Sequence, residues 1–193
     1  MVYAAVGDST GAGFGARSGG YVERLFAKID RERPGSRLLN LSAAGAGTEQ
    51  VLRRQVGRAL AARPTLVTIS VGTNDLLRGV PEEQFAENYE GVVARLGEAG
   101  AVVVATTLPD LSSLPETSAC AQCGLPARLA GFNRRIETIA RRHRILLVDI
   151  YALSREALPA HPEFVADDGM HPSDAGHEFW AEALWLAVGK VID

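Results

Sequence analysis

The sequence has no long apolar run and no excess of charge of one sign. No segment approaches the roughly 18 consecutive apolar residues that a membrane-spanning helix needs, so we expect no stable insertion into a membrane. The basic region, apolar run and cleavage site of a signal peptide are also missing from the start of the sequence. This favours the cytoplasm unless such a peptide has been removed. The formal net charge is −3 with acidic and basic residues interleaved, which argues against nucleic acid as a partner. Composition leaves the oligomeric state open.

Cysteine is also scarce. The two cysteines, Cys120 and Cys123, form a CxxC pair between Pro115 and Pro126. A redox pair of the thioredoxin type begins a helix directly after a strand, and a zinc site requires two further ligands nearby. The sequence shows neither context. We therefore expect a local disulfide or two free thiols in a loop, ahead of a metal site.

What the sequence does contain is a regular alternation of elements. At 193 residues and 47% hydrophobic composition, the chain is long enough for one α/β domain over residues 1–193 and short for two. Five short apolar runs, rich in β-branched residues, are typical of strands that are buried on both faces. These runs are Val2–Val6, Arg37–Leu41, Leu66–Val71, Ala101–Thr106 and Ile145–Asp149. Amphipathic helical patterns lie between and after them, including Tyr21–Arg31 and a last helix that begins near Ser173. The alternation predicts a parallel sheet with helices on both faces.

Ligands of such sheets bind beyond the carboxyl ends of the strands, so functional residues should come directly after strands. Two long segments without periodicity, Asp110–Pro126 and Leu158–Pro172, exceed ordinary connection lengths. We expect both segments to form walls of the site, and the first of them to influence substrate specificity.

The first strand runs into a glycine-rich stretch, "VGDSTGAGFGARSGG", which three kinds of site could use. A P-loop is excluded because no lysine follows at the required spacing. A dinucleotide fingerprint fits Gly11, Gly13 and Ala16, but the second strand ends near Asn40, where an acid should bind the ribose. The third possibility is a nucleophilic Ser9. A serine needs a base, an oriented acid and donors for the oxyanion.

Four blocks at the ends of strands and before the last helix supply these groups. They contain Ser9 in "GDS", Gly45 in "AAGAG", Asn74 in "GTND" and His171 in "DGMHP". In their order and spacing the blocks resemble the GDSL family of serine hydrolases, also called SGNH hydrolases, from end to end of the chain. The resemblance implies a flavodoxin-like three-layer α/β/α sandwich with a five-stranded parallel sheet in the order 2-1-3-4-5. We also expect Gly7 to let the chain turn sharply before the serine.

The resemblance implies a role for each block residue. Ser9 would attack the ester, His171 would be its base, and Asp168, three residues before the histidine, would orient the imidazole. The oxyanion hole would consist of the backbone N–H of Ser9, the backbone N–H of Gly45 and the side-chain amide of Asn74.

Positions next to these blocks leave alternatives open. Asp167 is a second choice for the acid, and Gly47 is a second choice for the glycine donor, because each lies beside or near the favoured residue. Thr10 stands where the family name has leucine, which is a common variation. We interpret Asp8 and Asp75 as structural, because short acids after strands usually cap helices or tie turns.

The remaining histidines are His143, His161 and His177. His143 lies in an arginine-rich helix end, where positive charge favours the helix dipole. None of the three has an acid at a useful spacing in the sequence, so we expect surface or structural roles for them.

Together, the residues and the resemblance predict an enzyme without metal or cofactor that cleaves a small-molecule carboxylic ester through an acyl-enzyme on Ser9. The short chain leaves little room for a large lid, which favours short-chain acyl or acetyl esters. A carbohydrate acetylesterase, a lysophospholipase or thioesterase, and an acyltransferase are the alternatives that the resemblance leaves open. A binding module without activity is disfavoured by the complete set of four block residues.

Overall fold

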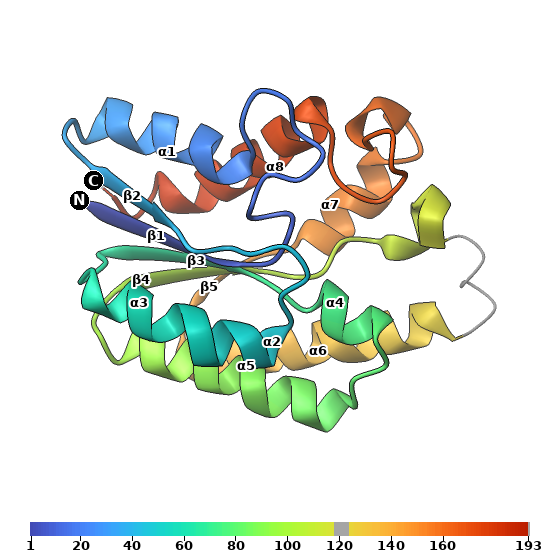
Figure 1. The fold of residues 1–193 in the computed structure, drawn as a ribbon, viewed down its shortest axis with the longest axis horizontal. Helices are drawn as coiled ribbons and strands as arrows, with labels where there is room; N and C mark the ends of the chain where they lie inside the picture. Colours follow the sequence, from blue (N-terminus) through green and yellow to red (C-terminus); the bar gives the residue numbers. More distant parts are fainter. Residues whose placement is uncertain (118–123, 193) are drawn as a thin grey trace.

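A sheet of five parallel strands forms the centre of the computed structural model, which describes residues 1–117 and 124–192. The strand order is β2-β1-β3-β4-β5 (Figure 1), so the predicted sheet and its order are confirmed. The strands are β1 (Val2–Gly7), β2 (Arg37–Asn40), β3 (Leu66–Ser70), β4 (Val102–Thr106) and β5 (Leu146–Val148).

The position of each strand in the sheet explains its composition. The inner strands β1, β3 and β4 are almost entirely buried, whereas the edge strands β2 and β5 are shorter and more exposed. A strand covered on both faces stays apolar without a polar alternation. Thr68 of β3 is polar and buried, and its hydroxyl shares a 2.8 Å hydrogen bond with the Tyr3 hydroxyl of β1, which offsets the desolvation of both groups.

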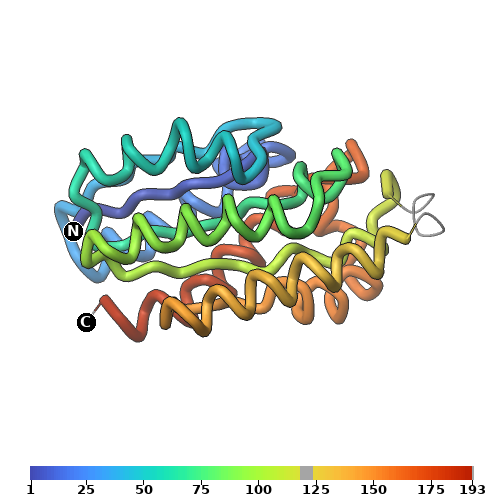
Figure 2. The backbone as a smooth tube through the Cα atoms, turned by 90° about the horizontal axis from the view of Figure 1, so that it is seen from below, coloured from blue at the N-terminus to red at the C-terminus, as the bar shows by residue number. Residues whose placement is uncertain are grey.

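Helices cover both faces of the sheet and complete the three predicted layers. On one face lie α1 (Tyr21–Glu32) and α8 (Asp174–Val188). On the other face lie α2 (Thr48–Gln50), the π-helical turn η1 (Val51–Gln55), α3 (Val56–Ala61), α5 (Glu82–Gly97) and α6 (Leu125–His143). Seen from below in Figure 2, α5 and α6 lie next to each other along the sheet.

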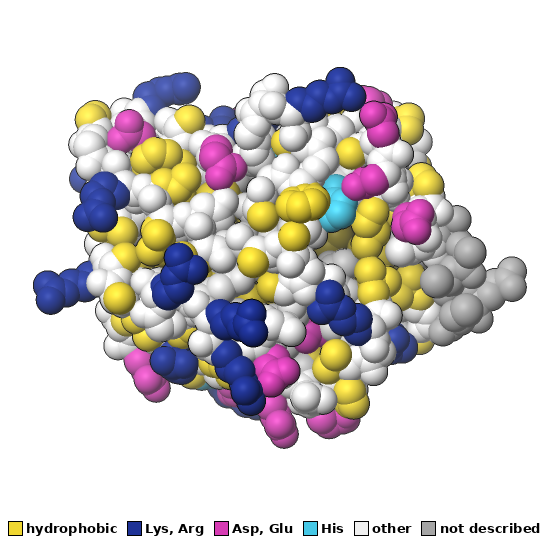
Figure 3. Space-filling view, in the orientation of Figure 1, with side chains coloured by type: hydrophobic (Ala, Val, Ile, Leu, Met, Phe, Trp, Pro, Cys, Tyr) yellow, Lys and Arg dark blue, Asp and Glu magenta, His cyan; other side chains and the backbone are white. Residues whose placement is uncertain are grey.

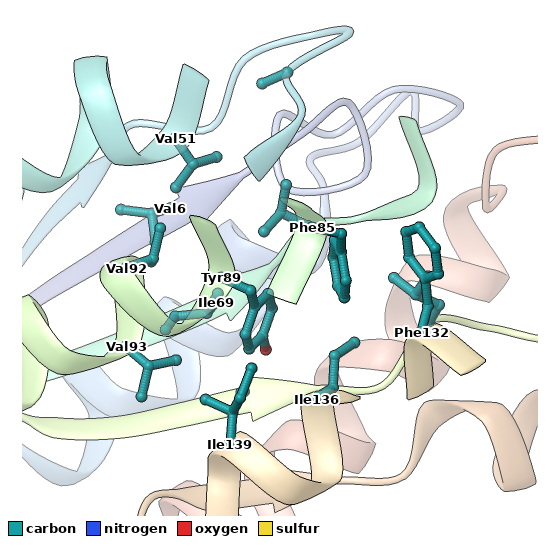
Figure 4. Packing of buried hydrophobic residues seen from close by; sticks show 14 of the residues in the cluster. Val6, Val51, Ile69, Phe85, Tyr89, Val92, Val93, Phe132, Ile136 and Ile139 are labelled. Carbon is teal, nitrogen blue, oxygen red and sulfur yellow. The ribbon is translucent and has the colours of Figure 1, made fainter. Parts of the chain in front are cut away.

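The larger part of the core lies between the sheet and the helices α5 and α6. Phe85, Tyr89, Phe132, Ile136 and Ile139 point toward one another there (Figure 4). The rings of Phe85 and Phe132 stack with their centroids 4.2 Å apart, and such a pair contributes about 0.5–1.5 kcal/mol beyond its buried area. This contact fixes α5 against α6 directly below the carboxyl edge of the sheet.

The opposite face is held by rings and ion pairs between α1 and α8. The rings of Tyr21 and Trp180 stack at 5.8 Å. Arg24 of α1 donates to both Asp174 and Glu178 of α8, each at 2.8 Å. These contacts fix the start of α8, which directly follows the block that contains His171.

Short elements follow the strands at the carboxyl edge of the sheet. They are α4 (Thr73–Leu77), η2 (Leu111–Ser113), α7 (Ile150–Ala157) and η4 (Pro162–Phe164). Cys120 and Cys123 lie outside the described residues, so the expectation for this pair stays a prediction. Across the two described ranges, no helix is both long enough and apolar enough to cross a membrane.

Candidate active site

Three of the four block residues follow three neighbouring strands. Ser9 comes after β1, Gly45 lies in the loop after β2, and Asn74 belongs to α4 after β3. Because β1 lies between β2 and β3 in the sheet, the loops with Gly45 and Asn74 flank the serine. The side-chain amide of Asn74 donates to the carbonyl of Ala46 at 3.2 Å, which joins these two loops.

The loop before α8 brings His171 to the serine. His171 Nε2 lies 2.9 Å from Ser9 Oγ, and its Nδ1 lies 2.6 Å from Asp168 Oδ2. The other carboxylate oxygen of Asp168 accepts the backbone N–H of Met170 and of His171, both at 2.9 Å. Residues 168–171 therefore form a turn in which the Asp168 carboxylate binds both the ring and the backbone N–H of His171.

The contacts of Asp168 set its charge. Desolvation opposes ionisation of this carboxyl, but the hydrogen bonds from the backbone and ring of His171 and from the N–H of Met170 outweigh it and lower its pKa to about 2. Asp168 is thus ionised at neutral pH and favours the proton on Nδ1 of His171. Nε2 is then the nitrogen that can accept the proton of the Ser9 hydroxyl.

Two backbone N–H groups and one side-chain N–H at the carboxyl edge of the sheet are available as hydrogen-bond donors. Within the described ranges, the N–H groups of Ser9 and Gly45 donate to no protein acceptor. Gly45 has φ +72°, a left-handed conformation that glycine adopts without the strain of a side chain. A backbone carbonyl can only accept, so the Ala46 carbonyl fixes the orientation of the Asn74 amide and leaves its second N–H available.

The two alternative residues have other partners. The N–H of Gly47 donates to Gln50 Oε1 at 2.8 Å and is therefore not a free donor. Asp167 lies at the surface, where its carboxylate contacts Arg17 at 3.4 Å. The geometry therefore favours Gly45 and Asp168 over these alternatives.

Gly7 has a different role from the predicted one. It does not have a left-handed φ, so no sharp turn depends on it. A Cβ at Gly7 would lie 2.3 Å from the carbonyl oxygen of Ser70 on β3, which means that the two strands approach too closely for any side chain. The expectation of a glycine-dependent turn is wrong, and close packing of backbone is the reason for the glycine.

Gln55 was not identified from the sequence. Its Oε1 accepts the N–H of Gly7 at 2.8 Å, and its Nε2 donates to the carbonyl of Gly7 at 2.9 Å. This buried amide thus binds the N–H of Gly7 at the end of β1, whose carbonyl also accepts the N–H of Ala43 from the segment after β2. Gln55 belongs to the π-helical turn η1, a deviation from α-helix that is frequent at functional sites. Because Gln55 and Gly7 are 48 residues apart, their spacing in the sequence does not indicate this contact.

The two acids beside the block residues have structural contacts. Asp75 accepts the backbone N–H and the hydroxyl of Thr48, which ties α4 to the start of α2. Asp8 is buried and accepts the N–H of Thr10 at 3.1 Å. Desolvation by burial raises the pKa of Asp8 to about 7, against the opposing effect of the Thr10 hydrogen bond.

We expect Asp8→Asn to stabilise the protein above pH 7. The folded pKa of about 7 exceeds the unfolded value of about 4. The carboxyl therefore costs no stability below pH about 4, and the free energy of unfolding falls as the pH rises from there through 7. Asparagine keeps the acceptor for Thr10 without a buried charge. Urea unfolding should give the variant an advantage on the order of 1–4 kcal/mol at pH 8, and a much smaller one at pH 5.

Asp167→Asn is the matched control, because its side chain is 99% exposed. It should leave the pH dependence of unfolding as in the unmodified protein. An identical pH dependence in Asp8→Asn and the unmodified protein would contradict a buried Asp8 carboxyl that titrates near neutrality.

The other histidines lie apart from Ser9 and His171. The ring of His177 accepts the N–H of Tyr21 and donates to the carbonyl of Phe14, and burial lowers its pKa. It therefore acts as a neutral structural link, as predicted. His143 contacts Glu90, 53 residues away in the sequence, and His161 contacts Glu163, each at 3.0 Å. The expectation that no acid lies at a useful spacing is wrong for His161, because Glu163 is two residues away.

A pocket extends from Ser9 and His171 toward the ends of β4 and β5. Its volume is about 70 Å³, and its lining is mainly apolar, with contributions from Leu111, Leu114, Leu158, Phe164 and Trp180. Both long segments that were expected to form walls contribute to it. In Figure 3 a histidine side chain borders a hollow on this face of the molecule. Within the part of the chain that the structure describes, no group of three or more histidine, cysteine or acidic residues could hold a metal ion.

The GDSL-like Lipase/Acylhydrolase family matches residues 5–179 of the chain. The chain belongs to this family. The predicted family is thereby confirmed.

Two relatives of the GDSL-like chain are esterases. Esterase TesA of Pseudomonas aeruginosa is 26% identical over 181 residues, which cover 93% of this chain and 84% of that protein. An acetylxylan esterase of Geobacillus stearothermophilus is 26% identical over 186 residues, which cover 91% of this chain and 84% of that protein. Family and relatives make this GDSL-like protein a carboxylic ester hydrolase.

Solved structures agree with the GDSL-like fold. A crystal structure of TesA has a TM-score of 0.80 at 26% identity, with coverage of 96% of this chain and 97% of its own. The acetylxylan esterase Axe2 of Geobacillus stearothermophilus has a TM-score of 0.82 at 23% identity and covers 97% and 94%. Esterase EstA from Pseudoalteromonas, inhibited by monoethylphosphonate in its crystal structure, has a TM-score of 0.78 at 22% identity and covers 98% and 97%.

Proposed function

We propose that this GDSL-like esterase hydrolyses short-chain carboxylic esters by nucleophilic attack of Ser9. The observation that carries the proposal is the pair of hydrogen bonds from Ser9 Oγ to His171 Nε2 at 2.9 Å and from His171 Nδ1 to Asp168 at 2.6 Å. A serine hydroxyl is a weak nucleophile until an adjacent base takes its proton. An imidazole whose other nitrogen is held by a carboxylate can act as that base.

The reaction has two halves. In the first, Ser9 Oγ attacks the carbonyl carbon while His171 Nε2 takes the hydroxyl proton. The tetrahedral intermediate collapses when the bond to the alcohol oxygen breaks, and the alcohol leaves with the proton from His171. In the second half, His171 takes a proton from water, the resulting hydroxide attacks the acyl-enzyme, and Ser9 leaves with the proton that the histidine returns. Asp168 stays ionised throughout and stabilises the imidazolium.

The negative charge of each intermediate develops on the carbonyl oxygen. We assign its stabilisation to the N–H of Ser9, the N–H of Gly45 and the free amide N–H of Asn74. Donors that are already oriented toward the oxyanion cost no reorganisation during the reaction. The hydrogen bond from Asn74 to Ala46 supports this assignment, since it holds the amide before substrate binds.

The acyl group is the part of the substrate that the apolar pocket fits. A volume of about 70 Å³ suits a few carbon atoms, and Leu111, Phe164 and Trp180 offer it no charged partner. Acetyl and other short acyl groups are therefore the proposed substrates, in line with the acetylxylan esterase among the relatives. We assign this activity to one hydrolase domain across residues 1–193.

Kinetics and covalent labelling test the proposal. With p-nitrophenyl esters of increasing chain length, kcat/KM should be highest for acetyl or butyryl and lower for decanoyl. A reactive ethyl phosphonate should abolish turnover, with one phosphonyl group on the peptide that contains Ser9. This probe is chosen because EstA is inhibited by monoethylphosphonate.

Two controls accompany the experiment. His171→Ala should slow the labelling strongly, because the hydroxyl then lacks its base, whereas Ser18→Ala, at an exposed serine in the same region, should label normally. A phosphonyl group on another serine, with Ser9 unmodified and turnover lost, would refute the assignment of the nucleophile. Highest activity on decanoyl esters would refute the assignment of the pocket.

A further inference from the structure

Three arginines that have no ion-pair partner among the described residues lie near the loop that contains Gly45. Arg54 of η1 and Arg58 of α3 line a surface hollow that they share with Gly45, Ala46 and Gln50. Arg78 follows α4, and its Nη2 would lie 3.3 Å from a Cβ placed on Gly45. All three side chains are exposed. They will be called the arginine cluster.

The acids near the arginine cluster are already engaged. Asp75 is buried and accepts from Thr48, and Glu49 pairs with Arg53 at 3.2 Å. Among the described residues, no acid lies within ion-pair distance of Arg54, Arg58 or Arg78. In Figure 3, dark blue side chains gather over the region of α2, α3 and α4 below the hollow.

This arrangement is unfavourable without a ligand. Arg54 of η1 and Arg58 of α3 line the same hollow, so their like charges repel each other weakly. Other exposed arginines, such as Arg31 and Arg37, also have no ion-pair partner among the described residues, so what distinguishes the arginine cluster is its position beside Gly45. An anion at the arginine cluster would relieve the repulsion and form charge-assisted hydrogen bonds.

We propose that the arginine cluster binds a carboxylate or phosphate on the alcohol part of the ester. This inference rests on the proposed function. The apolar pocket toward β4 and β5 takes the acyl group, so the alcohol part extends to the surface around the mouth of the site. Gly45 links the two regions, because it is the proposed oxyanion donor and also lines the hollow of Arg54 and Arg58.

A matched pair of acetyl esters tests the proposal. 4-Acetoxybenzoate carries a carboxylate on its alcohol part, and its methyl ester is the neutral counterpart; 4-acetoxyphenyl phosphate tests a phosphate in the same position. Arg78→Gln should lower kcat/KM for the two anionic esters by about tenfold and change that for the methyl ester less than twofold. Arg54→Gln should show the same selectivity with a smaller loss, and 0.5 M salt should reduce the preference for the anionic esters.

Arg31→Gln is the matched control, because it removes an exposed arginine in the last turn of α1, at the opposite edge of the sheet. It should alter none of the three activities. In Ser9→Ala, calorimetry should show binding of 4-acetoxybenzoate that the additional Arg78→Gln change weakens.

Two outcomes would overturn the proposal. Equal losses on neutral and anionic esters would mean that Arg78 stabilises the oxyanion and binds no anion on the substrate. No loss on any ester, with unchanged binding to Ser9→Ala, would mean that the arginine cluster does not contact the substrate. If the unmodified protein fails to hydrolyse even the neutral methyl ester, the proposed function fails instead, and binding to Ser9→Ala still decides the role of the arginine cluster.

Discussion

Ser9→Ala is expected to lower kcat for p-nitrophenyl acetate by at least about 10⁴-fold. The reason is that the change removes the protein atom that bonds to the carbonyl carbon of the substrate in the proposed mechanism. Because the ring of His171 is the one hydrogen-bond partner of the Ser9 hydroxyl among the described residues, loss of the hydroxyl should leave the thermal unfolding temperature almost unchanged. Steady-state kinetics with a thermal melt on the same sample would measure both effects. Ser18→Ala is the control with full activity.

His171→Ala should have an effect of similar size. In a serine hydrolase the nucleophile and its base act as one unit, so the double variant Ser9→Ala/His171→Ala should be no slower than either single variant. Losses that multiply in the double variant would contradict a shared proton transfer between the two residues. Full activity in His171→Ala would show that another group is the base.

The sequence could predict the sheet because its signal is local. Each buried strand is a nearly continuous apolar run, and the helices between the strands keep their apolar stripes, as in Phe85 and Tyr89 of α5. The order of the strands came from the family resemblance. Ser9, Gly45 and Asn74 could be predicted as a group because the carboxyl ends of parallel strands meet at one edge.

Other parts of the site depend on contacts that sequence spacing does not contain. The Gln55 amide reaches Gly7 only because a π-helical turn places it beside the end of β1. Glu90 reaches His143 across the packed helices α5 and α6. Glu163, in contrast, is two residues from His161 and could have been predicted as its partner. Gly7 was misinterpreted because a glycine needed for close packing has the same sequence signal as one needed for a turn.

Asn74→Ala is expected to lower kcat by about 10²–10³-fold with little change in KM. The amide contacts the substrate most strongly in the tetrahedral state, when the oxygen carries a full charge, so its loss raises the barrier without weakening binding of the ground state. Losing one such donor costs about 3–4 kcal/mol of transition-state stabilisation. Steady-state kinetics with p-nitrophenyl acetate separate kcat from KM.

Asn74→Asp sharpens this test, because aspartate keeps the size of the side chain and replaces the donor with a negative acceptor. It should be slower than Asn74→Ala, since its charge would repel the oxyanion. Asn88→Ala makes the same chemical change on α5 and should retain full activity. A loss that appears in KM with kcat preserved would instead place Asn74 in the binding of the ground state, and the oxyanion hole would then depend on the backbone N–H groups of Ser9 and Gly45 alone.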